Sequence, residues 1–270
     1  MESRTERVVS YGVLSVFTAV VLFPVLWFVL TALSPHSSGA VDLTSVGWSN
    51  FATAWKQADF SHAMLASIVV AVVTVAAQVI LAIMCGYGLG VLNAAGHRVI
   101  FPVILLGMMI STEAIIVPLY YQFRDMGLTN SWLGLIIIQV GMGVPFGTFW
   151  MRATFRAMPA SIVDSARIDG AGALRVLWAI LLPVAKPAVY TLVLLSFMWT
   201  WNDFFLALVF ISDPAKQTAP VALGVFQGRF MVQANYMAAA GLMVAAPVLV
   251  LYAAFQRKFI QGILTGAIKE

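Results

Sequence analysis

The chain has 270 residues, of which 61% are hydrophobic and 10% are charged, and its formal net charge is +4. Soluble domains are about half apolar and about a quarter charged, so this composition excludes an ordinary soluble domain and indicates a membrane protein. The basic residues stand at the ends of apolar stretches rather than in dense runs with interleaved aromatics, which argues against a nucleic-acid partner. The one cysteine, Cys85, lies inside an apolar stretch, so neither a disulfide framework nor a metal cluster is expected.

Six apolar, almost uncharged runs approach or exceed the roughly 20 residues that a helix needs to cross the hydrocarbon core of a bilayer. The first run is too long for the apolar core of a cleaved signal peptide, so we expect a retained transmembrane helix there. The predicted fold class is an all-α membrane protein in which residues 1–270 form a single domain of six transmembrane helices. The expected spans are 8–33, 64–92, 99–121, 132–151, 187–211 and 236–256.

The distribution of lysine and arginine predicts the orientation of these spans, because cytoplasmic loops are enriched in both. With the N-terminus inside, eleven of the fifteen basic residues face the cytoplasm. Both termini and the loop at 152–186, between the fourth and fifth spans, are therefore expected to be cytoplasmic. The eleven are Arg4, Arg7, Arg98, Arg152, Arg156, Arg167, Arg175, Lys186, Arg257, Lys258 and Lys269.

The first outer loop, residues 34–63, contains Trp48, Phe51 and Trp55. These side chains suit an amphipathic helix at the membrane interface or a docking surface. Aromatic residues are common at the level of the lipid headgroups, so the interfacial interpretation is favoured.

The cytoplasmic loop contains a polar, helix-compatible stretch in an otherwise apolar chain. Ser161 is expected to be an N-cap, with Asp164 three residues later in a position like that of a capping box. Gly170 permits a sharp turn, and Pro183 is expected to stop a second short helix, 174–182, before the fifth span begins. On composition alone, the two short helices suit either a knob that enters a partner's groove or a hairpin on the inner leaflet.

Asp164-Ser-Ala-x-x-x-Gly170, followed after nine residues by Ile180-x-Leu182-Pro183, resembles the EAA loop of bacterial ABC-importer permeases. That family has Glu-Ala-Ala, three residues, Gly, nine residues and Ile-x-Leu-Pro. Asp164 and Ser165 depart from the pattern, and the shorter carboxylate of Asp164 is expected to shift or weaken a salt bridge to the ATPase. The resemblance implies an ATPase-coupling site at Asp164, Ser165, Ala166, Asp169, Gly170, Ile180, Leu182 and Pro183.

Further stretches resemble the carbohydrate-importer branch of this family, related to the smaller subunit of maltose permeases. The C-terminal stretch is Gln256-Arg257-x-Phe259-x-x-Gly262 followed by Gly266-Ala267-x-Lys269, and its resemblance implies contacts of Gly266 and Lys269 with the ATPase. The other stretches are Gly127-Leu-Thr-Asn with Leu133-Gly-Leu, Trp201-Asn-Asp-Phe204, Pro214-Ala-Lys-Gln-Thr and residues 224–230.

The resemblance implies the permease subunit of an ATP-binding-cassette importer, a multi-pass protein of the bacterial inner (plasma) membrane that moves a sugar by alternating access. Its implied partners are a second permease subunit in a heterodimer, two cytoplasmic ATP-binding subunits and an extracytoplasmic solute-binding protein. ATP and Mg are used by the partner subunits, and no cofactor is expected on this chain. No lysine follows a phosphate-cradling glycine loop and no catalytic residue set stands out, so the chain is not expected to be an enzyme.

Two carboxylates, Glu113 and Asp203, fall inside expected spans, where an ionisable group is by default a functional candidate. At 1.5 Å per residue they lie roughly 18 Å and roughly 24 Å into the third and fifth spans, in the outer half of the bilayer. With Asn202, and with Trp199 and Trp201 for stacking on a sugar ring, they form a candidate solute pathway. For Asp203, a structural role between helices is as well supported as a role in the pathway. For Glu113, the pathway role is slightly favoured over a structural one.

Two alternatives to a sugar importer remain. One is a stand-alone ion-coupled secondary transporter or channel, which two isolated acids without a basic partner in a span disfavour. The other is the same machinery carrying a polyol or a glycerol-phosphate derivative. Gln78 and Gln139 are expected to form hydrogen bonds between helices, and solute contact is the less favoured alternative for both.

Overall fold

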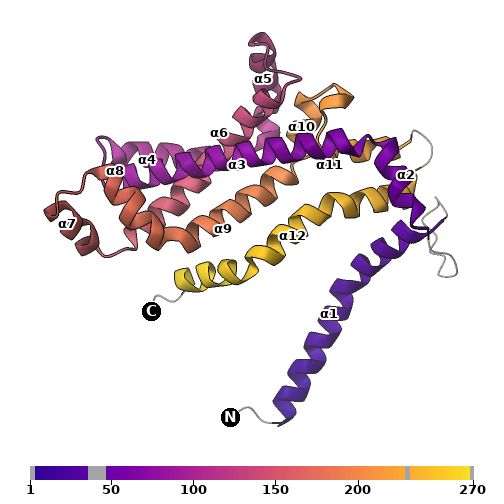
Figure 1. The fold of residues 1–270 in the computed structure, drawn as a ribbon, viewed down its shortest axis with the longest axis horizontal. Coiled ribbons are helices and arrows are strands. Elements are labelled where there is room, and N and C mark those ends of the chain that lie inside the picture. The colour runs from indigo at the N-terminus through magenta and orange to yellow at the C-terminus, as the bar shows by residue number, and fades with distance from the viewer. Residues whose placement is uncertain (1–3, 36–46, 229–231, 268–270) are drawn as a thin grey trace. The chain divides into compact units, whose positions relative to one another are not determined.

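The computed structural model describes residues 4–35, 47–228 and 232–267. At residues 4, 5 and 8 of the first helix and 257–267 of the last helix, it describes the backbone alone. Within those ranges every named element is helical, as expected for the all-α class (Figure 1). The elements are α1 Arg4–Leu33, α2 Ser49–Gln57, α3 Phe60–Gly90, α4 His97–Leu106, η1 Gly107–Met109, α5 Thr112–Asp125, α6 Trp132–Arg156, α7 Ala160–Ile168, α8 Ala173–Arg175, η2 Val176–Leu181, α9 Leu182–Trp201, α10 Phe205–Phe210, η3 Pro214–Lys216, α11 Ala219–Ala222, η4 Leu223–Phe226 and α12 Ala234–Ala267.

The expected third span is not one continuous helix. Five helices of the described chain are long and apolar enough to cross a membrane, and a sixth crossing requires that α4–η1 and α5 be counted together. These two pieces meet at a bend of 99°. Ile110 and Ser111 both adopt extended backbone conformations there, which ends the helical hydrogen-bond ladder.

The expected fifth span begins and ends earlier than predicted. Its helix runs from Ala173 to Trp201, and α10 follows after a break at residues 202–204. Pro183 therefore does not stop a helix: it lies in the first turn of α9, directly after the π-helical turn η2. A π turn interrupts the usual ladder, so a proline that lacks an N–H is accommodated there.

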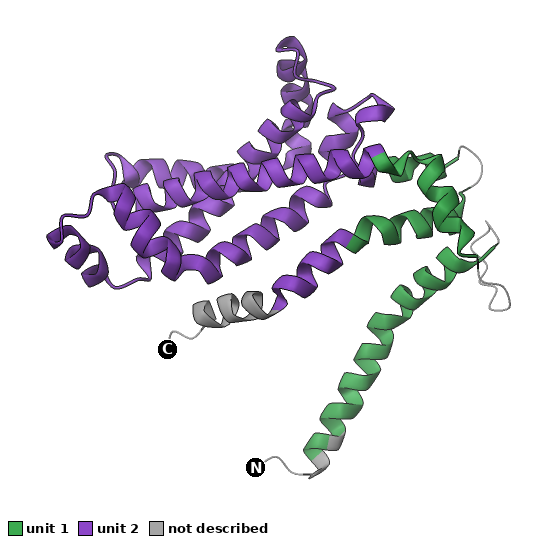
Figure 2. Cartoon of the chain, viewed as in Figure 1, with its two compact units in different colours: residues 1–61, 222–246 green, residues 62–221, 247–270 purple. Residues whose placement is uncertain are grey.

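The chain divides into two compact units (Figure 2). Unit 1 comprises residues 1–61 and 222–246, and unit 2 comprises residues 62–221 and 247–270. Within unit 1, the buried Asn50 amide fixes the start of α2 to the end of α1 by donating to the carbonyl oxygens of Ala32 (2.9 Å) and Ser34 (2.8 Å). Trp48 stacks on Phe51 at 5.9 Å and stays largely exposed, so an apolar aromatic surface is left uncovered beside α2.

In unit 2, α3 and α6 approach each other closely along a seam of small residues. A Cβ added to Gly86 would lie 2.7 Å from Cβ of Met151, and one added to Gly147 would lie 2.7 Å from Cβ of Ala82. One added to Gly143 would clash with the Gln78 amide. The contacts advance by four residues in the same direction on both helices, so α3 and α6 run parallel. Such small residues let membrane helices pack backbone against backbone.

Two apolar clusters fill unit 2. The first joins α3, α6, α7, η2 and α9 through residues that include Tyr87, Met151, Phe155, Val176 and Leu181. The second joins α3, α5, α6, α10 and α11, with Phe123 and Phe210 in edge-to-face contact at 5.8 Å. Both clusters draw on α3 and α6, so the seam is common to them.

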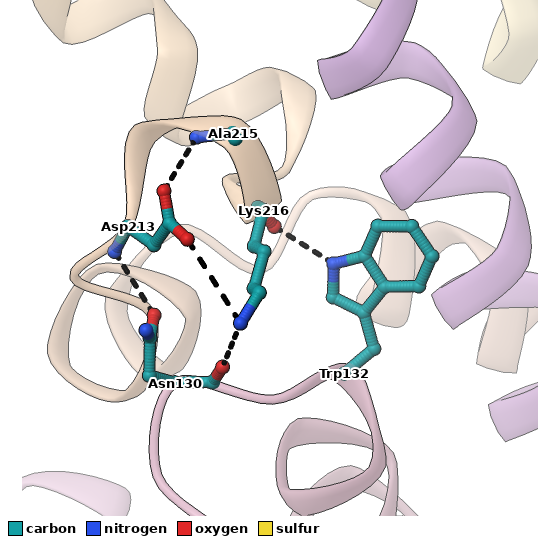
Figure 3. A network of polar contacts seen from close by, with 5 residues as sticks. All are labelled: Asn130, Trp132, Asp213, Ala215 and Lys216. Atoms are coloured by element: carbon teal, nitrogen blue, oxygen red, sulfur yellow. Dashed lines mark hydrogen bonds and ion pairs between the residues drawn. The ribbon is translucent and has the colours of Figure 1, made fainter.

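Polar contacts connect the turn before α6 with the segment after α10 (Figure 3). Asn130 Oδ1 accepts from the Asp213 N–H at 2.9 Å, and Lys216 Nζ donates to the Asn130 carbonyl at 3.2 Å. The Trp132 indole donates to the Lys216 carbonyl at 2.9 Å. Two of the stretches that resemble the carbohydrate-importer branch, 127–130 and 214–218, are thus joined into one structure.

We predict that Gly86→Ala destabilises the protein by about 1–3 kcal/mol, because the new methyl group overpacks the contact with Met151. Gly88→Ala is the matched control on the same helix, since nothing lies within 4 Å of its added Cβ. Thermal unfolding in detergent is the measurement. Equal melting temperatures for the two variants would contradict the close α3–α6 packing.

Candidate functional site

A cavity of about 750 Å³ lies within unit 2, at the bend between η1 and α5 and beside α3, α6 and the end of α9. We call it the polar cavity, because amide, hydroxyl and carboxylate groups contribute to its wall. Its lining residues are Gln78, Gly107, Met108, Ile110, Thr112, Gln139, Met142, Gly143, Leu195, Met198, Trp199, Thr200, Asn202 and Asp203.

Asp203 is held at the cavity wall by two neutral donors. Gln139 Nε2 donates to Asp203 Oδ2 at 2.7 Å, and the Leu206 N–H donates to Oδ1 at 3.2 Å. The second bond caps the first turn of α10, so the carboxylate occupies the helix break after α9. Asp203 therefore both ties α6 to this break and lines the cavity.

Gln78 and Gln139 are buried polar residues of the cavity wall. Gln78 Nε2 donates to the Gln139 carbonyl at 2.7 Å, and Thr74 Oγ1 donates to Gln139 Oε1 at 3.3 Å. Both glutamines are about 6% exposed, so their hydrogen bonds link α3 to α6 as predicted. Both residues also line the cavity, which is the position that the less favoured solute-contact alternative requires.

Of the aromatic candidates, Trp199 lines the cavity and Trp201 does not. Trp199 is about half exposed and meets Phe146 edge-on at 4.8 Å. Trp201 is buried and stacks on Phe197 at 5.3 Å. Asn202 is exposed at the break and donates to the Met198 carbonyl at 2.8 Å.

Glu113 lies in the first turn of α5, past the bend, and is exposed. It accepts a hydrogen bond from the Ser111 hydroxyl. Its neighbour Thr112, which the sequence analysis did not single out, lines the cavity whereas Glu113 does not. The straight-helix measure of depth does not apply to Glu113, because the bend intervenes, nor to Asp203, because the helix ends at Trp201.

The loop predicted to be cytoplasmic, residues 152–186, forms α7, a glycine turn and α8. The helix starts earlier than predicted: Pro159 is the N-cap, no side-chain cap is present, and Ser161 lies inside the first turn. Pro159 has the extended ψ of 129° that the N-cap position requires, so Ser161 cannot occupy it. Gly170 has a φ of +76°, the left-handed conformation that a sharp turn needs and that glycine adopts at little cost.

The loop has a buried face and an exposed face. Val163 and Ala166 pack into the first apolar cluster, and the Tyr87 hydroxyl donates to the Ala173 carbonyl at 3.0 Å. Ile168 and Leu174 project outward with 86% and 68% of their surface exposed. The remaining candidate residues are exposed except for Ile180 and Leu182, which are half-buried; the exposed ones are Asp164, Ser165, Asp169, Gly170 and Pro183.

Gly266 lies in the last turn of α12, and Lys269 lies outside the described residues. Among the side chains that the structure describes, no three His, Cys, Asp or Glu residues gather in a way that suits a metal ion.

The sequence profile of the family described as "Binding-protein-dependent transport system inner membrane component" matches residues 78–264. The trehalose transport system permease protein SugB of Mycobacterium tuberculosis is 30% identical over 92% of this chain and 92% of that protein. The diacetylchitobiose uptake system permease protein NgcG of Streptomyces coelicolor is 28% identical over 98% of this chain and 90% of that protein. The melibiose/raffinose/stachyose import permease protein MelC of Bacillus subtilis is 28% identical over 98% of this chain and 99% of that protein.

Known structures share the fold. A chain of a bacterial ABC transporter involved in the import of the acidic polysaccharide alginate superimposes with a TM-score of 0.82 at 24% identity, covering 96% of this chain and 99% of that one. A chain of the alginate transporter in complex with an alginate pentasaccharide-bound periplasmic protein gives a TM-score of 0.67 at 15% identity, covering 95% and 96%.

We predict that Gly143→Ala displaces the Gln78 amide, because the added methyl group would occupy its position. Loss of the Gln78–Gln139 hydrogen bond and overpacking together should destabilise the protein by about 1–3 kcal/mol. Gly141→Ala is the control, since nothing lies within 4 Å of its added Cβ. The measurement is the melting temperature of both variants in detergent. A wild-type melting temperature for Gly143→Ala would contradict the described position of Gln78.

Proposed function

The chain belongs to the family of binding-protein-dependent transport system inner membrane components, and from this membership we propose that it is the permease subunit of an ATP-driven sugar importer. The observation that carries the proposal is the family match over residues 78–264, which includes both the polar cavity and the cytoplasmic loop. Relatives whose names refer to trehalose, diacetylchitobiose and melibiose, raffinose and stachyose support a sugar as the solute. The chain itself is not an enzyme in this proposal.

In this proposal an extracytoplasmic binding protein delivers the solute, and a second permease subunit completes the pathway as a heterodimer. Two cytoplasmic subunits bind ATP and Mg and grip the outward-facing side of α7 and α8. The exposed Ile168 and Leu174, together with the exposed Asp164, suit a groove that combines apolar and charged contacts. The C-terminal residues Gly266 and Lys269 add contacts to the same subunits.

The proposed orientation has both termini and the α7–α8 loop in the cytoplasm of a bacterial cell, with six crossings of the inner membrane. The excess of basic residues on that side supports it. The six crossings count α4–η1 and α5 as one broken span. Broken helices are tolerated in a membrane where they line a polar cavity, and the polar cavity lies at this bend.

The solute pathway is proposed to include Asp203, Asn202 and Trp199, which share the cavity wall. Carboxylate and amide groups exchange hydrogen bonds with sugar hydroxyls, and an indole face packs against the apolar face of a sugar ring. Glu113 is assigned to the edge of the cavity, beside Thr112, and Trp201 to the support of the wall from within.

The helix that begins in the cytoplasmic loop ends at the polar cavity, and this continuity supports a lever mechanism. Ala173–Trp201 spans 29 residues, roughly 43 Å at 1.5 Å per residue. Closure of the ATPase dimer on ATP would move the loop, and this helix would carry the motion to Asn202 and Asp203. Alternating access then takes the form of a rigid-body exchange between two packed states.

Gly170→Val tests the coupling role of the loop. Valine is strained at a φ of +76°, so the turn should open and ATP-dependent sugar uptake by the reconstituted importer should fall at least tenfold. Gly172→Val is the control, because Gly172 has an extended backbone (φ −68°, ψ 160°) and open space around it. Membrane insertion of both variants is checked by membrane fractionation. Normal uptake by an inserted Gly170→Val variant would overturn the coupling role.

Asp164→Lys should likewise abolish ATP-dependent uptake while the protein still inserts, because it reverses the charge on the exposed face of α7. Asp164→Glu restores the residue of the family pattern and should support uptake at or above the wild-type rate. The comparison uses the ATPase activity and uptake of the same reconstituted importer. Wild-type uptake by Asp164→Lys, or lost uptake in Asp164→Glu, would contradict a contact through this carboxylate.

A further inference from the structure

The charge of the polar cavity sets the class of solute that it accepts, an inference that rests on the proposed function. Among the lining residues in the described part of the chain, Asp203 carries the single ionisable side chain, and no lysine, arginine or histidine stands beside it. The other polar contributors are neutral: the amides of Gln78, Gln139 and Asn202 and the hydroxyls of Thr112 and Thr200.

The partners of Asp203 hold its carboxylate in place without a compensating positive charge. An amide at 2.7 Å and a backbone N–H at 3.2 Å occupy one site on each oxygen. An ionised carboxylate has about four acceptor sites, so acceptor capacity remains. Because donors fix its position, the carboxylate cannot rotate away from a solute without breaking both bonds.

This arrangement treats hydroxyl groups and anions differently. A hydroxyl that donates to a carboxylate forms a charge-assisted hydrogen bond, which is stronger than a neutral one. A phosphate, sulfonate or uronate group in the same cavity meets a like charge, and the repulsion is large because a partly enclosed site has a lower effective dielectric constant than water. Specificity often arises from such a repulsive element against the wrong ligand.

We propose that the polar cavity is a solute site of this subunit that accepts hydroxylated solutes without negative charge and rejects their anionic derivatives. Neutral sugars, polyols and amino sugars fit it, with Asp203 accepting from hydroxyl or ammonium groups and the exposed face of Trp199 packing against the ring. Phosphorylated solutes, including glycerol phosphates, do not. The shared fold does not dictate this choice, since a transporter with the same fold imports an acidic polysaccharide.

A single engineered thiol reports on the cavity directly. Cys85 is the one native cysteine, so Thr112→Cys in a Cys85→Ser background places one thiol at the lining. The complete importer, with its partner subunits in lipid nanodiscs, is treated with methanethiosulfonates that carry either a trimethylammonium or a sulfonate group. Ala95→Cys, in the exposed loop before α4, is the control thiol.

The cationic reagent should react several-fold faster than the anionic one at Thr112→Cys, relative to the same ratio at Ala95→Cys. Asp203→Asn should narrow that difference at Thr112→Cys and leave Ala95→Cys unchanged. Glu113 adjoins the probe and also favours the cationic reagent. The decisive quantity is therefore the change that Asp203→Asn causes in the ratio of the two reaction rates at Thr112→Cys. If Asp203→Asn does not assemble, Asn202→Asp adds a charge to the same wall and should widen the difference instead.

Protection by sugars tests the solute class. The neutral disaccharides trehalose, melibiose and diacetylchitobiose are screened for protection of Thr112→Cys, and the most protective one is compared with its 6-phosphate. The phosphate should protect at least about tenfold less well, and Asp203→Asn should reduce this gap.

Equal protection by the sugar and its phosphate would overturn the charge selection. No protection by any of the three, in an importer that still takes up sugar with ATP, would overturn the solute site and leave the proposed function intact. A wild-type complex that shows no ATP-dependent uptake of any sugar would overturn the proposed function and this inference with it.

Discussion

The close parallel packing of α3 against α6 is the contact on which the rest of unit 2 depends. Lipid supplies no hydrophobic driving force between helices, so association relies on van der Waals contact and hydrogen bonds. Gly86, Gly147 and Ala82 remove the side-chain volume that would hold the two backbones apart. One end of the seam anchors Tyr87 and the loop that it holds, while the other carries Gln78 and the polar cavity. The packing of α3 against α6 therefore positions both the α7–α8 loop and the polar cavity.

The polar groups follow from that packing. An amide in the membrane needs a partner, and the approach of the helices at Gly143 brings Gln78 within 2.7 Å of the Gln139 carbonyl. Gln139 can then direct its own amide to Asp203. The carboxylate in turn caps α10, which lets the chain break after Trp201 without leaving that helix start unsupported. A continuous series of hydrogen bonds therefore supports the cavity wall across the helix break.

The sequence predicts the helical class and the exposed glycine turn, because the first depends on local composition and the second on one backbone angle. It does not predict the 99° bend, because Ser111 and Glu113 suit a helix start but nothing local fixes the angle between the two helices. The prediction that Pro183 ends a helix was wrong, because no local sequence pattern indicates the π turn that accommodates this proline. Two signals were available and missed. Gly143 and Gly147 form a small-xxx-small pattern, and Trp199 and Trp201, two positions apart, must face opposite sides of a helix at about 100° per residue.

The location of Asp203 has a consequence for coupling. A ligand shifts an equilibrium between two states only if it binds them with different affinities. Asp203 follows the helix that begins at Ala173, beside α7, while its hydrogen-bond partner Gln139 belongs to α6. Any motion that separates α9 from α6 must lengthen the 2.7 Å bond and free an oxygen of the carboxylate. In the proposed mechanism, the freed acceptor site adds to those already open to a solute hydroxyl, so the affinity for solute depends on the position of this helix. In the proposed mechanism, the same carboxylate therefore discriminates between solutes by charge and responds to the position of the helix that begins beside α7.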